Sequence, residues 1–481
     1  MLVQRTLNNR NLVIWLSILF LVMLSGCSSR PINEPISQAD PQTGYRPYLL
    51  LPKRLNNDQE TLFVLSFSGG GTRAAAFSYG LLEELKRTEL LVNGQPRRLI
   101  DEVDLIMGVS GGSFTALAYA LYGDKLFLDY EERFLKRNVQ GTLMARAFNP
   151  FNWYKIIGGS AGRSELAADY YDEILFQGAT FGDLLDKQGP VAIATGTDLS
   201  TGSRFAFYQN DFDLICSDLN TVRLSRAAAT SSAVPVVLSP ITYDNYGGQC
   251  NYQYPAWVKD VADPKTRKRP DARAYRRYLE MELLQDSEKR PYIHLVDGGV
   301  SDNIGARGVL EALEEIRISA EFRGEIGFGK IRNVILMVVN AHSAPDTSWN
   351  LYENPPGLFS QLMQSTGVPI DRYSFETIET MKDRAEAMKQ RRELLVAKRQ
   401  LAGISYEEAQ AGVPKINMEV IDISFDAIKD GSEKDYFMDL PTSFVLPAEA
   451  VDRLREMAGQ LLRQSDKLQT IIDNFDDKPG K

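Results

Sequence analysis

Three apolar, strand-like runs of this chain each end in a loop that carries glycines, and a helix-like stretch follows each loop. The runs lie at residues 62–67, 103–109 and 292–296. Behind the first two, small and apolar residues at about 73–87 and 113–121 show the spacing of packed helices. Strands that alternate with helices in this way are typical of an α/β fold.

The loop after the second run carries a serine between glycines. Residues 108–112 read GVSGG, which satisfies the G-x-S-x-G pattern of a nucleophile elbow. In that turn the serine has a strained backbone, and the flanking glycines let strand and helix approach closely enough to expose its hydroxyl. Ser110 is therefore a candidate nucleophile, with Gly108 and Gly112 as elbow glycines. An ordinary glycine-rich turn is the alternative.

The loop after the first run holds three consecutive glycines, Gly69, Gly70 and Gly71. Backbone N–H groups of glycines at a helix N-terminus are unblocked, so they can bind an anion or the oxyanion of an acyl-transfer intermediate. Arg73, just inside the helix, adds a positive charge. A nucleotide-binding loop is a rival interpretation, but neither phosphate-loop pattern can be read here. A purely structural glycine turn is the other alternative.

The third run ends at Asp297, which Gly298 and Gly299 follow. In open α/β sheets, loops at the carboxyl ends of the strands meet at one edge, and ligands bind there. An Asp-Gly pair by itself usually marks only a turn. A glycine loop, a serine elbow and an aspartate at three strand ends of one chain together indicate a hydrolase site.

Taken in order, SGGGTR at residues 68–73, GVSGG at 108–112 and DGG at 297–299 resemble the motifs of the patatin-like phospholipases. AAATSSAVPVVLSPI at 227–241 is also similar to that family's segment of small residues followed by a proline. The resemblance covers about residues 59–345. It departs from the family's frequent Asp, Gly and Pro at three positions, which here hold Ser68, Ala74 and Gly305.

The resemblance implies a three-layer α/β fold with a mainly parallel central sheet. It also implies an acyl-ester hydrolase of phospholipids or lysophospholipids, without cofactor or metal, that works through a Ser-Asp dyad and an acyl-enzyme. Ser110 would attack the ester carbonyl and Asp297 would accept its proton. The implied oxyanion hole consists of Gly69, Gly70, Gly71 and Arg73, and the implied motif glycines are Gly108, Gly112, Gly298 and Gly299.

The only two histidines of the chain decide whether a Ser-His-Asp triad is available. His294 lies three residues before Asp297 on the same expected strand, and this odd spacing points the two side chains to opposite faces. His342 follows another strand end, and the order Ser, Asp, His is that of the α/β-hydrolases. We favour the dyad because the glycine loop and the DGG motif match the dyad family. A triad with His342 is the alternative.

Two other functions are compatible with the same motifs. One is a catalytically idle lipid-binding or scaffold lipoprotein that has kept the fold, because a fold by itself does not guarantee an activity. The other is a carboxylesterase or thioesterase of small acyl substrates, which would use the same chemistry with a different pocket.

Residues 1–26 resemble a bacterial lipoprotein signal peptide. Two arginines precede an apolar run at 12–24, which is too short for an ordinary transmembrane span, and LSGC at 24–27 follows. This predicts a lipidated Cys27 as the first mature residue, and the serine after it resembles the signal for the outer membrane of Gram-negative bacteria. An uncleaved membrane anchor is the alternative. Residues 27–58 are predicted to form a flexible tether.

Charge and cysteine content limit the partners. The chain has 54 Lys and Arg against 63 Asp and Glu, a formal charge of −9, and loss of residues 1–26 leaves 52 against 63, or −11. Nucleic acid is therefore not expected as a partner, and membrane contact beyond the acyl anchor should be local. Cys216 and Cys250 pair in an oxidising compartment only if the fold brings them together, which the sequence leaves open.

Two segments within the resembling region have two interpretations each. Residues 263–291 are rich in Arg and Lys and form either a solvated loop or a flap that meets phospholipid head groups. Residues 148–159 are rich in aromatic residues, which either line the core or an acyl pocket or contact lipid.

Beyond the resembling region, residues 346–481 are predicted to form an extension that packs on the core. A highly charged helix is expected at 378–400, and its charges suit solvent or a protein partner. A half-buried strand at 415–425 and an amphipathic helix at 448–462 complete the extension.

Overall fold

The structure is a computed structural model. It describes residues 30–54, 57–92, 95–150, 162–263, 272–345, 347–413 and 416–476. The predicted signal peptide, Cys27, most of the aromatic segment 148–159 and residues 264–271 of the basic segment lie outside the described residues.

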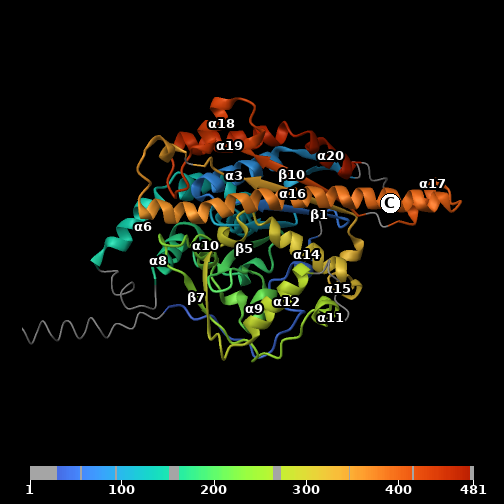
Figure 1. Cartoon of the computed structure of the whole chain (residues 1–481), viewed down its shortest axis with the longest axis horizontal. Helices are drawn as coiled ribbons and strands as arrows, with labels where there is room; N and C mark the ends of the chain where they lie inside the picture. The colour runs from blue at the N-terminus through green and yellow to red at the C-terminus, as the bar shows by residue number, and fades with distance from the viewer. Residues whose placement is uncertain are drawn as a thin grey trace, which may run out of the picture.

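A mainly parallel sheet of eight strands forms the middle layer, with helices on both faces (Figure 1). Its order is β10-β9-β1-β4-β5-β8-β7, and β6 pairs with β5. The parallel strands are β10 (Asn417–Ser424), β9 (Asn333–Asn340), β1 (Thr61–Phe67), β4 (Leu105–Gly108) and β5 (Val191–Asp198). The antiparallel strands are β6 (Arg204–Ala206), β8 (Tyr292–Asp297) and β7 (Ile241–Asp244). The predicted three-layer α/β fold is thereby confirmed.

The central strands β1 and β9 are almost wholly buried along their length. Their sequences, TLFVLSF and NVILMVVN, are nearly continuous apolar runs rather than alternating ones. Continuous runs suit strands that helices cover on both faces. A separate two-stranded hairpin is formed by β2 (Glu89–Val92) and β3 (Gln95–Arg98).

Helices follow the strands largely where the sequence predicts them. β1 leads into α3 (Gly71–Arg87) and β4 into α4 (Gly111–Tyr122). β8 leads into the short α13 (Gly299–Asp302) and then α14 (Ala306–Ile318). Within the described residues before 345, the other α-helices are α2 (Pro47–Leu50), α5 (Leu126–Tyr130), α6 (Val139–Phe148), α8 (Arg163–Tyr171), α9 (Gln209–Leu214), α10 (Leu224–Ser231), α11 (Ala256–Ala262), α12 (Ala272–Gln285) and α15 (Ala320–Glu325).

The strand that ends at Asp297 runs antiparallel to its neighbour β5, whereas the sequence leads us to expect three parallel strands that end at one edge. β8 is antiparallel to β5, and Asp297 stands opposite Gly196. β4 ends at Gly108, which pairs with Ala194 of the same β5. β8 therefore enters from beyond the carboxyl end of β5 and stops level with the turn after β4. Asp297 reaches the expected edge of the sheet, but not as the end of a parallel strand.

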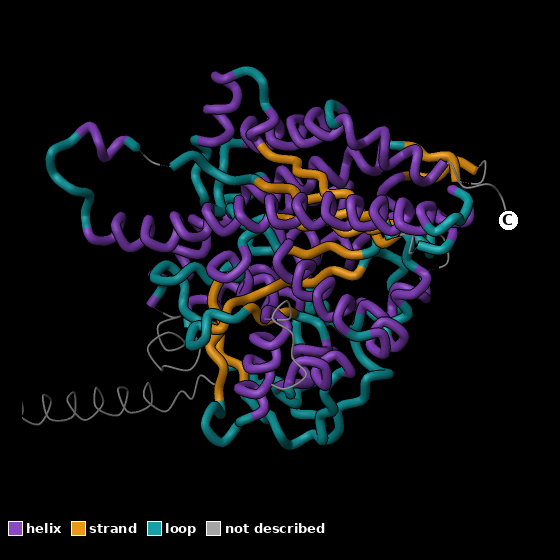
Figure 2. The backbone as a smooth tube through the Cα atoms, turned by 45° about the vertical axis from the view of Figure 1, so that its right-hand side comes forward, coloured by secondary structure: helices purple, strands orange, loops and turns teal. Residues whose placement is uncertain are grey.

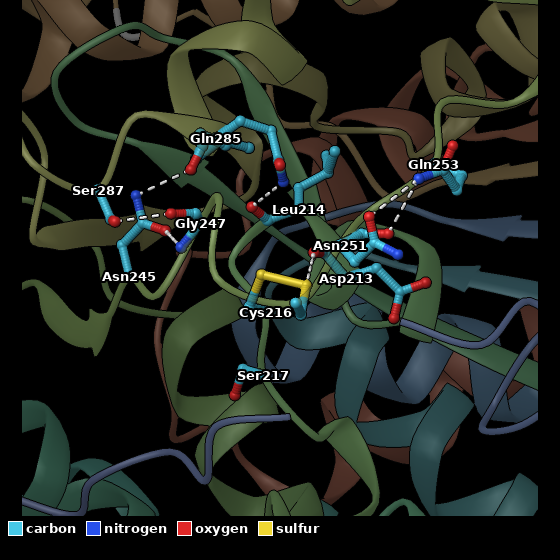
Figure 3. The surroundings of a disulfide bond; sticks show 12 residues. Asp213, Leu214, Cys216, Ser217, Asn245, Gly247, Asn251, Gln253, Gln285 and Ser287 are labelled. Carbon is cyan, nitrogen blue, oxygen red and sulfur yellow. Dashed lines mark hydrogen bonds between the residues drawn. A yellow bond between two sulfur atoms is a disulfide. The ribbon is translucent and has the colours of Figure 1, made fainter. Parts of the chain in front are cut away.

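Residues 30–54 lie packed along the α/β body where the sequence predicts a flexible tether. Arg30 pairs with Asp244 of β7 at 2.6 Å, and the buried Arg46 pairs with Asp213 at 2.6 Å. The carbonyls of the two cysteines accept N–H groups from this segment, and Cys216 and Cys250 form a disulfide (Figure 3). The segment is held because its polar groups find partners on the body.

The C-terminal extension completes the central sheet. β10 pairs in parallel with β9 over its whole length, and α19 (Ala448–Arg463) packs on α3. The charged helix is longer than expected: α16 (Leu358–Leu401) runs across the molecule. Its C-terminal end, which leads into α17 (Tyr406–Ala411), projects beyond the body in Figure 1, and its N-terminal end stands out in the turned view of Figure 2. The remaining described helices are α18 (Gly431–Met438) and α20 (Asp466–Asp476). A protein partner for α16 stays a prediction.

Across the described ranges, no helix combines the length and the apolar character that a membrane span needs.

Candidate active site

Ser110 occupies a strained turn between β4 and α4. Its backbone has φ 47° and ψ −120°, a conformation that residues with a side chain rarely adopt. Neighbouring chain leaves no room for side chains at Gly108 and Gly112, where an added Cβ would lie 2.7 Å from Ser113 Cα and from Phe67 Cβ, respectively. The close approach of strand and helix that defines a nucleophile elbow is therefore present at Ser110.

Asp297 lies directly against this serine. Ser110 Oγ donates a hydrogen bond to Asp297 Oδ2 at 2.8 Å. The other carboxylate oxygen, Oδ1, accepts the N–H of Gly299 at 2.7 Å. Gly298 is a close-approach glycine, since a Cβ there would overlap the Thr195 carbonyl. Ser110 and Asp297, which are 187 residues apart in sequence, thus meet as a hydrogen-bonded pair.

Burial sets the protonation behaviour of Asp297. The residue is only 6% exposed, and burial raises the pKa of its carboxyl to about 6. The hydrogen bonds from Gly299 N–H and Ser110 O–H act in the opposite direction, because they stabilise the carboxylate. The group is therefore mostly ionised at neutral pH and can accept a proton there.

The segment of small residues around α10 holds both members of the pair. Ser110 donates its N–H to Ser231 Oγ at 2.9 Å, and Gly298 donates its N–H to the Ser231 carbonyl at 3.1 Å. Asp297 donates its N–H to the Ala233 carbonyl at 3.0 Å. The sequence analysis does not predict this role of Ser231. The one hint in the sequence is that Ser231 lies in the run of small residues that the family resemblance includes.

The glycine loop leaves two N–H groups without acceptors beside the Ser110 turn. Gly69 donates its N–H to the Asn303 carbonyl at 2.8 Å, and Thr72 donates to the Ser443 carbonyl at 2.8 Å. Between them, Gly70 (φ 138°) and Gly71 (φ 60°) have no hydrogen-bond acceptor within the described residues. These two donors stand at the N-terminus of α3, where an anion is favoured.

Asn303 is a site residue that the sequence analysis missed. A Cβ on Gly69 would overlap Asn303 Oδ1 and lie 3.2 Å from Ser110 Cβ. A Cβ on Gly299 would lie 2.8 Å from the same Oδ1 and 3.0 Å from Asp297 Oδ1. The carboxamide thus lies between the glycine loop and the Ser–Asp pair. In the sequence, only its closeness to Asp297, six residues earlier, could have indicated that Asn303 lies at the site.

The hydrogen bonds of the Arg73 side chain go to groups other than Ser110 and Asp297. Its Nε donates to the Ala341 carbonyl at 2.9 Å, Nη1 donates to the Leu440 carbonyl, and Nη2 donates to Thr442 Oγ1 at 3.1 Å. Burial lowers its pKa to about 10, so the guanidinium stays charged at neutral pH. A direct contact of Arg73 with an oxyanion stays a prediction.

The two histidines make their hydrogen bonds and ion pairs elsewhere. His342 Nε2 lies 3.3 Å from Asp426 Oδ2, and the exposed His294 shares a hydrogen bond of 2.9 Å between its Nδ1 and Thr242 Oγ1. Within the part of the chain that the structure describes, neither ring hydrogen-bonds Ser110 or Asp297. Nor do those residues bring together three or more His, Cys, Asp or Glu side chains fit to hold a metal ion.

The sequence matches the family model described as patatin-like phospholipase over residues 65–310, just over half of the chain. Together with the fold, this match supports a lipid hydrolase in general. The chain belongs to the patatin-like phospholipase family.

Distant likenesses exist among solved structures. Human GIVD cytosolic phospholipase A2 aligns with a TM-score of 0.45 and 12% identity, over 89% of this chain and 65% of that chain. The same enzyme in complex with methyl gamma-linolenyl fluorophosphonate aligns with a TM-score of 0.38 and 12% identity, over 89% of this chain and 62% of that chain. VipD from Legionella pneumophila aligns with a TM-score of 0.28 and 12% identity, over 92% of this chain and 72% of that chain. This chain therefore spans just under two thirds of the human structures. No match was found among curated protein sequences.

Proposed function

We propose that this protein hydrolyses acyl esters of phospholipids or lysophospholipids with a Ser110–Asp297 dyad. The observation that carries the proposal is the 2.8 Å hydrogen bond from Ser110 Oγ to Asp297 Oδ2 in a member of the patatin-like phospholipase family. The strained turn at Ser110 supports the same chemistry, and so do the amides of Gly70 and Gly71, for which the described part of the chain supplies no acceptor.

The reaction proceeds in two steps. In the first step, Ser110 Oγ attacks the ester carbonyl carbon while Asp297 accepts the hydroxyl proton, and a tetrahedral oxyanion forms. The C–O bond to the leaving alcohol then breaks, the alcohol takes the proton from Asp297, and the acyl group stays on Ser110. In the second step, water gives a proton to Asp297 and attacks the acyl carbon. Ser110 leaves with that proton, and the fatty acid is released.

The N–H groups of Gly70 and Gly71 are the donors that we assign to the oxyanion. They lack acceptors within the described residues, and preorganised donors of this kind stabilise charge that develops in the transition state. The Asn303 carboxamide lies beside Gly69 and Gly299. Because rotation of a carboxamide exchanges its oxygen and nitrogen, we include the Asn303 NH2 group as a further candidate donor.

We also propose that Cys27 is lipidated and holds the protein at the cell envelope, at the outer membrane. The signal-like sequence supports this, and Arg30 is paired with Asp244 only three residues after Cys27. Three residues span at most about 11 Å, so the anchor would hold the body close to the lipid surface. Fatty-acid labelling of cells that express the wild type and Cys27→Ala tests this: label on both proteins would refute the assignment.

The decisive test compares the purified wild-type protein with Ser110→Ala. Phospholipid vesicles, a lysophospholipid and a short-chain ester serve as substrates, and Ser432→Ala, an exposed serine of α18, serves as the matched control. We expect lipid hydrolysis by the wild type and the control, and its loss in Ser110→Ala. Cleavage of the short-chain ester alone would identify a small-substrate esterase. A folded wild type without activity, or an active Ser110→Ala, would refute the dyad enzyme.

A further inference from the structure

A short segment of the C-terminal extension lies directly on the glycine loop. Thr72 donates its N–H to the Ser443 carbonyl at 2.8 Å, and a Cβ on Gly71 would overlap that carbonyl. Residues 440–444, which we call the C-terminal clamp, lie well beyond residue 310, where the family match ends. The loop that carries the Gly70 and Gly71 amides therefore contacts, and is shaped by, a segment from outside the matched region.

Arg73 ties the start of α3 to this clamp. All three of its nitrogens donate hydrogen bonds: one to the loop after β9 and two to the clamp, at the Leu440 carbonyl and Thr442 Oγ1. The residue is only 2% exposed. A buried charge is tolerated when its donors are satisfied, so this set of acceptors fixes where the guanidinium and the first turn of α3 can lie.

The other end of the clamp is anchored to the helix behind Ser110. The Phe444 ring packs at 5.6 Å, between ring centroids, from Phe114 of α4. Its N–H donates to Gln140 Oε1 at 3.2 Å, and its carbonyl accepts the Gln140 N–H at 3.1 Å. The clamp thus connects the glycine loop with the helix that begins at the serine turn.

The geometry of this loop matters because oxyanion donors work only when they are held in place. Preorganised N–H groups stabilise a transition state through directions set before the reaction, and a small misplacement costs much of the effect. Consecutive glycines do not hold such a shape by themselves. The Ser443 carbonyl and the bonds of Arg73 supply the constraint.

We propose that the C-terminal clamp positions the oxyanion-binding loop, with Arg73 and Thr442 as positioning residues that act through the loop. The inference rests on the proposed function, because it assigns the loop to the oxyanion of that reaction. It replaces the expected direct contact of Arg73 with an indirect role, and it makes the C-terminal extension part of the active site.

Steady-state kinetics of the purified wild-type protein and its variants test the clamp. Thr442→Val removes one acceptor of Arg73 and keeps the shape of the side chain. We expect kcat to fall about 3- to 10-fold in Thr442→Val and about 10- to 100-fold in Arg73→Lys, with KM nearly unchanged. The double variant should be no worse than Arg73→Lys alone, because the two residues act as one unit. Thr470→Val, an exposed threonine of α20, is the matched control and should behave as wild type.

Two further readouts separate positioning from a merely structural role. Phosphonylation of Ser110 by a fluorophosphonate should slow by the same factor as kcat, because its tetrahedral adduct uses the same donors. Backbone hydrogen exchange over residues 68–77 should be faster in Thr442→Val than in wild type, while the melting temperatures agree. A folded Thr442→Val with wild-type kcat and wild-type exchange would overturn the clamp. An active Ser110→Ala would refute the proposed function instead, and the exchange result would still decide the clamp.

Discussion

Ser110 is held in a conformation that costs free energy, and its neighbours supply the restraint. A residue with a side chain at φ 47° is disfavoured by on the order of 1–3 kcal/mol and persists only when its surroundings impose it. Here the Ser110 N–H is bound by Ser231 Oγ and its hydroxyl by Asp297. The strain therefore lies at the residue to which we assign the nucleophile.

Removal of the Asp297 carboxylate should separate the dyad from the triad. We expect Asp297→Asn to lower kcat about 10²- to 10⁴-fold, because an amide cannot accept the Ser110 proton. His342→Ala should keep most of the activity, since the ring pairs with Asp426 and not with the Ser–Asp pair. Ester hydrolysis by both variants, with circular dichroism as the check on folding, is the measurement. A collapse in His342→Ala with an intact fold would favour the triad.

The pH dependence of hydrolysis should report the Asp297 carboxyl. Its pKa is raised to about 6 by burial, and the base must be unprotonated to act. We therefore expect kcat/KM on a non-titrating soluble ester to be constant above about pH 7. It should reach half its plateau near pH 6 and fall about tenfold per unit at lower pH. A profile that stays flat down to pH 5 would exclude Asp297 as the base.

At the scale of elements, the two glycine-bearing turns lie back to back. α3 and α4 pack against each other, and the Gly71 carbonyl lies against the Cα of Gly111, the residue after Ser110. Backbone atoms of Gly71 therefore occupy the space that a side chain at Gly111 would need. Unlike the end of a flexible side chain, these backbone atoms cannot easily move aside.

Gly111→Ala tests this contact. We expect the free energy of unfolding to fall by about 1–3 kcal/mol, with loss of hydrolysis, because the new Cβ would overlap the Gly71 carbonyl. Urea denaturation is the measurement. Gly324→Ala in α15 is the matched control, since a Cβ there meets nothing within 4 Å. Equal stabilities for the two variants would contradict the close packing of the turns.

At the scale of the whole molecule, residues 30–54 and the described part of the C-terminal extension are both built into the α/β body. The N-terminal segment pairs with the region of the disulfide, through Ile36 N–H to the Cys216 carbonyl and Ala39 N–H to the Cys250 carbonyl, each at 2.8 Å. At the other end, β10 covers the edge of β9. Two segments outside the region that resembles the family, residues 30–54 and β10, thus pack on the α/β body.

Loss of the disulfide should destabilise the whole molecule. It joins residues 34 apart, and closure of a loop of that size stabilises a fold by about 2–4 kcal/mol. We expect Cys216→Ser with Cys250→Ser to lower the free energy of unfolding by that amount in urea denaturation. Wild type under reducing conditions should match the double variant, and wild type under oxidising conditions should not. No difference between oxidised wild type and the variant would show that the bond does not form in solution.

The sequence by itself determined the α/β class and most strands and helices, and it singled out Ser110, Asp297 and the glycine loop as candidate site residues. These follow from local chemistry. A buried strand needs an apolar run, a tight strand-to-helix turn needs glycines, and each appears within a few adjacent residues. The family resemblance depends on the same short motifs, and the match over residues 65–310 confirms it.

Only the tertiary structure decided which distant groups meet. The direction of β8, the pairing of Cys216 with Cys250, the packing of residues 30–54 and the contacts of Arg73 all join segments far apart in the chain. Asn303, Ser231 and Ser443 escaped notice for the same reason, since a single polar residue carries no local signal of its partner. Long-range contacts are selected by the packing of the whole core, and a short stretch of sequence does not contain that information.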